Sequence, residues 1–168
     1  MKLIELKKRF NSIVVVTLQD TVEDITISFI KKVAVMDKNF LYIIVPRYFS
    51  KKYKSLNIFD NIIVDEKLKF YDVILHVDFH STVYSTCAIE SVYFGVPNIL
   101  LDFNDKSSNF FNDILKIGKF NNYVKNKSQF LRVINKSEKI SKESVIKAHQ
   151  DICTSNYRYN IENIKKLV

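Results

Sequence analysis

The chain has 168 residues, of which 47% are hydrophobic, and its formal net charge is +8. This composition excludes a largely disordered protein, and the length suits one domain over residues 1–168. No apolar run is long enough for a membrane span, and two cysteines predict neither a disulfide framework nor a metal site. We therefore expect a cytoplasmic protein that needs no metal or cofactor.

The positive charge is spread along the chain rather than gathered in one block. A charge of this size attracts phosphorylated ligands, nucleic acid or anionic membrane surfaces, but a solvated lysine-rich surface has the same composition. Because no basic stripe alternates with aromatic residues, binding of nucleic acid is not expected. The composition is compatible with both interpretations, an anion-attracting face and a plain solvated surface.

Apolar runs alternate with amphipathic stretches through the first hundred residues. The run 13–18 is rich in β-branched residues, which is typical of a strand buried on both faces. From Thr21 to Met36 the apolar residues recur at helical spacing. The same patterns predict further strands at 40–45, 61–64, 73–77 and 98–102, and a short helix within 50–56.

Three helical segments are predicted after the fifth strand, at 108–117, at 128–135, and from 141 to about 168 with a break near Thr154. Strands that alternate with helices form βαβ units, whose strands are parallel. The sequence therefore predicts an α/β, three-layer Rossmann-like domain with a parallel sheet of about five strands in the order 3-2-1-4-5.

The segment 84–97 holds one of only two glycines and one of only two prolines. Ser85 and Thr86 precede an apolar stretch that Gly95 and Pro97 follow, which predicts a helix over about 85–94. A helix that starts at the carboxyl end of a strand is a phosphate-binding arrangement in α/β sheets. Glu90 shares a helix face with Thr86 and is suited to accept hydrogen bonds from ribose hydroxyls. The alternative is that Ser85 and Thr86 only cap the helix.

The pattern Ser-Thr-x-x-x-Glu-x-x-x-x-Gly-x-Pro at 85–97 resembles the donor-binding helix of GT-B glycosyltransferases. It is most similar to bacterial capsule polysaccharide, sialyl- and polyglycerol-phosphate-type transferases. The resemblance implies a C-terminal-type domain that binds a nucleotide sugar, with the phosphates at Ser85 and Thr86 and the ribose or base at Glu90. The strand that ends in Thr17-Leu18-Gln19 also resembles the first unit of such a domain, which adds Gln19 to the nucleotide site.

Relatives of the capsule and sialyl types end the second strand with a His-Pro pair, where this chain has Val45-Pro46-Arg47. Arg47 is then the cation expected to hold a phosphate, which arginine does through two parallel hydrogen bonds. GT-B enzymes have two Rossmann-like halves, and this chain has the length of one. The resemblance thus implies transfer only with a partner chain or an N-terminal domain, or self-association through the open interdomain face.

His80 is expected in the loop before the central helix, as a catalytic base or phosphate ligand, whereas His76 is expected to be structural. The chain has no Gly-x-Ser-x-Gly elbow, dinucleotide-binding fingerprint or P-loop, which argues against those enzyme classes. Three hypotheses remain. The chain is the donor-binding half of a glycosyltransferase of surface polysaccharide or glycan synthesis, a catalytically degenerate interaction module, or a nucleotide-sugar epimerase-like domain.

Overall fold

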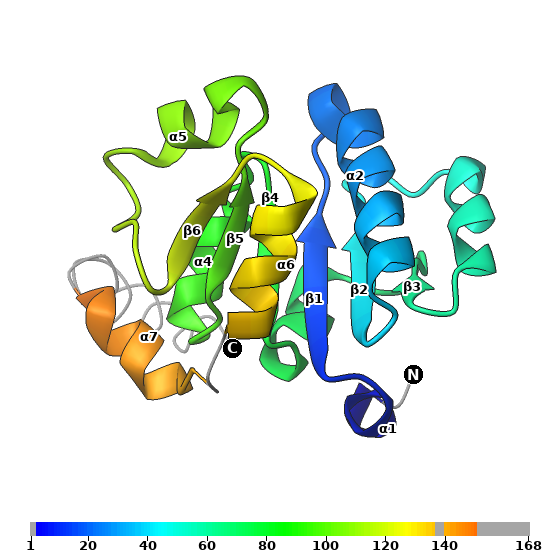
Figure 1. Cartoon of the computed structure of the whole chain (residues 1–168), viewed down its shortest axis with the longest axis horizontal. Helices are drawn as coiled ribbons and strands as arrows, with labels where there is room; N and C mark the ends of the chain where they lie inside the picture. Colours follow the sequence, from blue (N-terminus) through cyan, green and yellow to red (C-terminus); the bar gives the residue numbers. More distant parts are fainter. Residues whose placement is uncertain (1–2, 137–139, 151–168) are drawn as a thin grey trace, which may run out of the picture.

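Six parallel strands form one sheet in the order β3-β2-β1-β4-β5-β6 in the computed structural model, which describes residues 3–136 and 140–150 (Figure 1). The predicted order of five strands is confirmed, and β6 adds an edge strand that was not predicted. The strands are β1 (Ser12–Thr17), β2 (Phe40–Val45), β3 (Ile62–Ile63), β4 (Phe79–Thr82), β5 (Asn98–Leu101) and β6 (Asn121–Val124).

Helices cover both faces of this sheet, so the predicted three-layer α/β architecture is confirmed. Side chains of α2 and α6 pack against Val14 and Val16 on one face, and α3 and α4 lie on the other. The helices are α1 (Leu3–Arg9), α2 (Glu23–Met36), α3 (Phe70–Val73), α4 (Cys87–Tyr93), α5 (Lys106–Phe111), α6 (Lys127–Lys136) and α7 (Lys142–Ala148), with 3-10 turns η1 (Asp20–Val22), η2 (Lys51–Ile58), η3 (Ile74–His76) and η4 (Phe103–Asp105). In residues 3–136 and 140–150, none of these helices has the length and apolar character needed to cross a bilayer.

The strand predicted at 73–77 is wrong, because this stretch forms the end of α3 and the turn η3. Phe70, Val73, Ile74 and Val77 are all buried in one core cluster, at a spacing that suits a helical turn as well as a strand. The fourth strand is instead β4, whose residues look like a polar loop in the sequence. His80 therefore lies in a central strand, and His76 lies exposed in η3.

Several predicted boundaries also move. The central helix α4 is shorter than 85–94, although Ala88 and Val92 are fully buried in the core. The helix predicted at 108–117 is replaced by α5, which ends at Phe111. Beyond α7, the long helix predicted to about 168, with its break near Thr154, lies outside the described residues.

Gly95 joins α4 to β5 with a φ of +71°, and its backbone lies against the first turn of α7. A Cβ added there would lie 2.5 Å from Lys142 Cβ and 2.7 Å from Lys142 Cα. We expect Gly95→Ala to destabilise the domain by about 1–3 kcal/mol, because a left-handed backbone and an overlap with α7 are combined. Urea unfolding measures this change.

Gly118→Ala is the control, since Gly118 also has a positive φ of +145° but an added Cβ would meet nothing within 4 Å. Hydrogen exchange of the α7 amides should accelerate in Gly95→Ala and stay unchanged in Gly118→Ala. Equal exchange in both variants would show that Gly95 does not hold α7 in place.

Candidate functional site

The sheet reverses its strand order between β1 and β4, which are adjacent in space but not in sequence. In open α/β sheets, ligands bind outside the carboxyl ends of the strands at such a switch point. The loops that leave β1, β2 and β4 at this edge carry Gln19, Arg47 and Ser85 (upper edge in Figure 1). The topology thus brings to one edge the residues that the sequence predicts for a nucleotide site.

Gln19 ties the loop after β1 to the loop after β4. Its Nε2 donates to Thr82 Oγ1 at 2.9 Å, and its Oε1 accepts from the backbone N–H of Tyr84 at 3.4 Å. A second link is a hydrogen bond between the hydroxyls of Thr21 and Tyr84. Gln19 therefore fixes the segment that leads into α4, and a direct contact with a nucleotide stays a prediction.

Ser85 lies immediately before Thr86, the N-cap residue of α4. The Ser85 carbonyl accepts from the Ala88 N–H at 3.0 Å, and its Oγ accepts from the Cys87 N–H at 3.3 Å. Ser85 thus bonds the backbone at the start of α4, whereas Thr86, at the N-cap position, makes no side-chain cap hydrogen bond and keeps its hydroxyl exposed at the positive end of the helix.

Glu90 lies one turn further along α4 and is half-buried. Its Oε2 accepts a hydrogen bond from the hydroxyl of Tyr71 on α3, and this bond raises the pKa of Tyr71 to about 12. The ring of Tyr71 also packs edge-on against Phe94, with centroids 6.1 Å apart. Tyr71 was missed in the sequence because its 19-residue separation from Glu90 has no local signal.

Arg47 leaves the carboxyl end of β2 and is exposed, with its guanidinium 5.8 Å from the centroid of the Tyr48 ring. Strand β1 separates β2 from β4, so the tips of those two strands lie about 10 Å apart. A long side chain spans much of that distance. Arg47 thus stands on the same edge as Ser85, on the other side of the switch point.

His80 is not in a loop as predicted, because β4 carries it into the sheet with no exposed surface. Its Nε2 lies 2.8 Å from Thr17 Oγ1, and its Nδ1 lies 2.7 Å from Asn98 Oδ1. Burial lowers the pKa of His80 to about 4, against a smaller opposing effect of the Asn98 hydrogen bond. A neutral, enclosed ring with both nitrogens bonded does not reach a ligand at the carboxyl edge.

His80 belongs to a buried polar chain of five side chains that crosses the sheet under α4. Asn98 Nδ2 donates to Asn121 Oδ1 at 2.7 Å, and Asn121 Nδ2 lies 2.6 Å from His149 Nε2. We call this set the buried polar chain: Thr17, His80, Asn98, Asn121 and His149. It connects β1, β4, β5 and β6 to the residue that follows α7.

The carboxyl ends of β5 and β6 hold a second group of charges. Lys125 Nζ lies 2.6 Å from Asp105 Oδ1 and 3.8 Å from Asp102 Oδ2, while Asp102 Oδ1 also accepts from the Ser108 N–H at 2.9 Å. The charge of Lys125 is therefore largely neutralised. Across the part of the chain that the structure describes, no cluster of histidine, cysteine and acidic side chains suits a metal ion.

Solved structures with a similar fold include a polymerase, a glycosyltransferase and a protein assigned as an epimerase. The wall teichoic acid polymerase TagF, soaked with CDPG, superposes with a TM-score of 0.66 and 11% identity over 98% of this chain. The calicheamicin glycosyltransferase CalG4 gives 0.61 and 14% over 93%. A protein assigned as a UDP-N-acetylglucosamine 2-epimerase from Listeria monocytogenes gives 0.59 and 13% over 84%.

The chain spans less than half of each of these proteins, at 44% of TagF and 41% of the other two. No protein-family model and no curated protein sequence matches it. At these identities the likeness establishes a fold, one that matches a Rossmann-like half of a GT-B protein.

Proposed function

We propose that this chain is the donor-binding half of a GT-B glycosyltransferase of surface polysaccharide or glycan synthesis. The observation that carries the proposal is that Gln19, Arg47, Ser85 and Thr86 all lie at the carboxyl edge of the sheet, on loops around the switch point of this fold. Similar folds occur in a named glycosyltransferase and in a polymerase that was soaked with CDPG. The resemblance of the motif 85–97 to donor-binding helices supports the same function.

A nucleoside diphosphate suits the chemistry of this edge. The hydroxyls of Ser85 and Thr86 donate to phosphate oxygens next to the positive end of α4. Arg47 adds a fixed positive charge from the other side of the switch point. Glu90, held by the Tyr71 hydroxyl, accepts from the ribose hydroxyls. In transfer, these donors stabilise the charge that develops on the leaving diphosphate.

The acceptor and the general base are proposed to come from a second domain, on the same or a partner chain, or from a second copy. His80 does not act as this base in the proposal, because its ring is buried and both ring nitrogens are hydrogen-bonded within the sheet. With half of the cleft formed by another domain, binding to this chain alone is expected to be weak. Dissociation constants of tens of micromolar to millimolar correspond to roughly 4–6 kcal/mol.

Nucleotide binding is tested by isothermal titration calorimetry with uridine, cytidine and guanosine diphosphates. Thr86→Val should weaken the nucleotide that binds best by about 1–2 kcal/mol, because a hydrogen bond to a charged oxygen is lost. Thr86→Ser keeps the hydroxyl and should restore most of the affinity. Equal losses in both variants would count against a phosphate at Thr86.

Glu90→Gln should weaken a ribonucleotide about 5- to 20-fold through the lost charged acceptor, while a 2′,3′-dideoxy analogue should bind both forms equally. If both ligands weaken together, Glu90 does not face the ribose. Absence of binding by every nucleotide at millimolar concentration would leave the hypothesis of a catalytically degenerate interaction module.

An epimerase-like domain is the second candidate, and the Listeria monocytogenes structure favours it. Epimerisation changes the sugar but releases no acceptor product, so the two reactions are separable. Combined with the proposed second domain, the chain should convert a UDP-sugar into its epimer if it is epimerase-like, and should transfer the sugar to an acceptor if it is a glycosyltransferase. Nuclear magnetic resonance of the sugar anomeric protons distinguishes them.

A further inference from the structure

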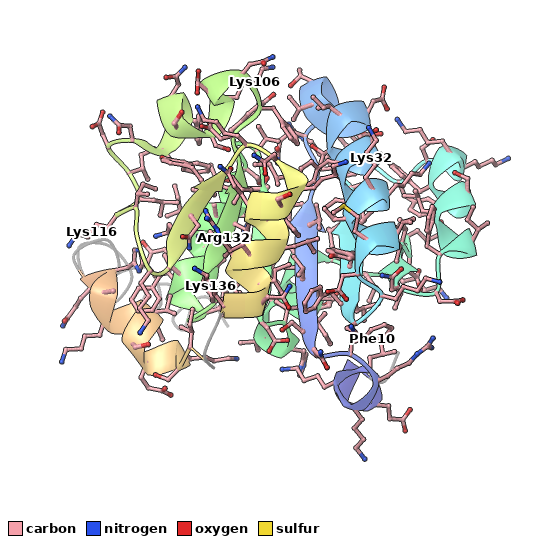
Figure 2. All side chains as sticks on the ribbon, in the orientation of Figure 1. Phe10, Lys32, Lys106, Lys116, Arg132 and Lys136 are labelled. Carbon is pink, nitrogen blue, oxygen red and sulfur yellow. The ribbon has the colours of Figure 1, made fainter. Side chains whose placement is uncertain are left out.

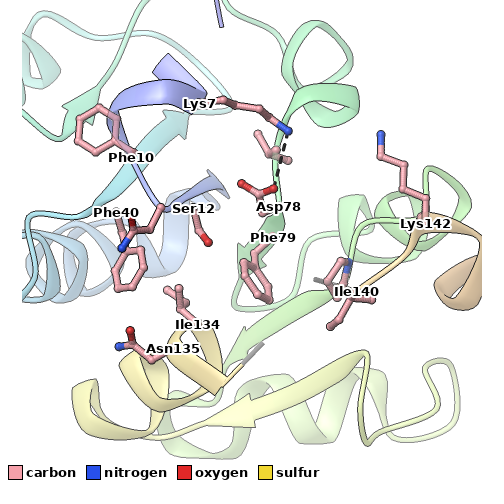
Figure 3. A pocket seen from close by; sticks show the side chains of 14 residues that line it. Lys7, Phe10, Ser12, Phe40, Asp78, Phe79, Ile134, Asn135, Ile140 and Lys142 are labelled. Atoms are coloured by element: carbon pink, nitrogen blue, oxygen red, sulfur yellow. Dashed lines mark ion pairs between the residues drawn. The ribbon is translucent and has the colours of Figure 1, made fainter. Parts of the chain in front are cut away.

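Two hollows lie on the amino side of the sheet, away from Ser85. The larger cavity, of about 720 Å³, is bordered by Lys7, Asp78, Phe79 and Lys142 (Figure 3). Both of its lysines are occupied: Lys7 Nζ lies 3.7 Å from Asp78 Oδ1, and Lys142 Nζ donates to the Leu75 carbonyl at 2.9 Å. Both cations of this cavity thus already have a polar partner, and one of those partners is a carboxylate.

The smaller hollow is cationic. It has a volume of about 350 Å³ and lies where α6 passes over β6. We call it the α6–β6 groove, and its lining is Phe79, Lys119, Asn122, Arg132, Val133, Lys136 and Ile140. Three of these seven residues are cations, one is an amide, and no lining residue is acidic.

The fold makes the three cations converge. Arg132 and Lys136 are four residues apart on α6, so they project from one helix face, and Figure 2 shows both directed over β5 and β6. Lys119 lies two residues before the start of β6 and lines the same groove, with its Nζ 5.7 Å from the centroid of the Phe120 ring. Phe79, Val133 and Ile140 supply an apolar surface beside these charges.

Within residues 3–136 and 140–150, no carboxylate forms an ion pair with Lys119, Arg132 or Lys136. Lys136 lies in the last turn of α6, where a cation favours the helix dipole. That explanation covers neither Lys119 nor Arg132. Like charges that share a groove repel one another, and an anion between them removes this cost.

We propose that the α6–β6 groove binds the phosphate groups of a small organic phosphate. The planar guanidinium of Arg132 suits two oxygens of one phosphate, Lys119 and Lys136 act as mobile point charges, and the Asn122 amide is a further donor. The groove is larger than one phosphate ion, so a diphosphate or a phosphate ester packed against Phe79 fits it. This site lies on the opposite edge of the sheet from Ser85 and does not depend on the proposed function.

The test is a titration of the ¹⁵N-labelled full chain with inorganic pyrophosphate, followed by nuclear magnetic resonance. We expect saturable shifts at the Asn122 and Val133 amides and at Arg132 Nε. Replacing Lys119, Arg132 and Lys136 together by glutamine should weaken this binding at least about ten-fold. Shifts at Ser85 and Thr86 report the donor site separately, so either site can fail without the other.

The control replaces Lys31, Lys32 and Lys38 by glutamine, which removes the same charge from α2 and the turn after it. It should leave pyrophosphate binding at the groove unchanged. Equal weakening in the control, or no shift at Asn122 and Arg132 in the wild-type chain, would overturn the proposal. Because all substituted side chains in both triple variants are charged and exposed or half-exposed, their spectra should otherwise match the wild type.

Two further titrations identify the source of the phosphate. Vesicles of phosphatidylcholine with phosphatidic acid should sediment the wild-type chain, but not the groove variant, if the phosphate belongs to a lipid headgroup. If only pyrophosphate binds, the ligand is a free phosphate compound. Polyglutamate that binds the groove as tightly as pyrophosphate would overturn phosphate recognition and indicate an acidic protein partner.

Discussion

Replacing Asn98 with leucine is expected to destabilise the domain by about 3–5 kcal/mol. The Asn98 side chain is fully buried and makes four hydrogen bonds: it accepts from His80 Nδ1 and Ser91 Oγ, and it donates to the Ala88 carbonyl and to Asn121 Oδ1. Leucine fills a similar volume but removes the partner of His80 Nδ1 and of Asn121 Oδ1 in a region that water does not reach. The cost of unpaired buried polar groups therefore dominates.

Asn122→Leu is the matched control for this variant. Asn122 lies on the next strand, is half-buried, and faces α6 rather than the buried polar chain. Its replacement should change the free energy of unfolding by less than about 0.5 kcal/mol. Urea unfolding followed by circular dichroism compares the two. A loss below about 1 kcal/mol in Asn98→Leu would mean that the side chain hydrogen bonds contribute little net stability.

Stability is expected to fall as the pH drops from about 6.5 towards 4, because His80 is neutral in the folded protein. Its pKa is lowered from 6.5 in the unfolded chain to about 4 in the fold, chiefly by burial. Between these values the unfolded state binds a proton that the folded state does not, so protonation favours unfolding. The contribution is complete above pH 6.5, and its full loss near pH 4 amounts to roughly 3 kcal/mol.

The measurement is urea unfolding at several pH values between 4 and 7. The His80→Gln variant should show a flatter dependence of unfolding free energy on pH, even if its stability at pH 7 is lower. His76→Gln removes an exposed histidine from η3 and should keep the wild-type slope. A wild-type slope that persists in His80→Gln would assign the pH dependence to other groups.

Strands with apolar side chains on both faces could be predicted from the sequence, and strands with polar side chains on one face could not. The continuous runs of β1 and β2 show a strand buried on both faces, and their order in the sheet follows from the alternation with helices. In β4 and β6, His80 and Asn121 occupy core positions that aliphatic residues usually take. Their polarity is typical of a loop until the partners across the sheet are known.

In the candidate site, too, the local features could be predicted from the sequence, and the contacts between distant residues could not. The motif 85–97 is local, so a helix that starts within two residues of Ser85 and ends before Gly95 could be predicted from short-range rules. The contacts that orient its side chains are not local: Gln19 bonds Thr82 across 63 residues, and Tyr71 reaches Glu90 from α3. Such pairs depend on which strands become neighbours, a fact that no short segment contains.

All donors of the buried polar chain point in one direction, and this limits how the protein can diverge. Backbone carbonyls of Ala88, Lys116 and Val145 fix the orientations of Asn98, Asn121 and His149 in turn. His80 must then donate through Nδ1 and accept from Thr17 through Nε2. Reversing one member sets donor against donor, so drift at one of these positions requires concerted change at its neighbours. We therefore expect these five residues to change together among related sequences, although they are spread over 133 positions of the chain from residue 17 to residue 149.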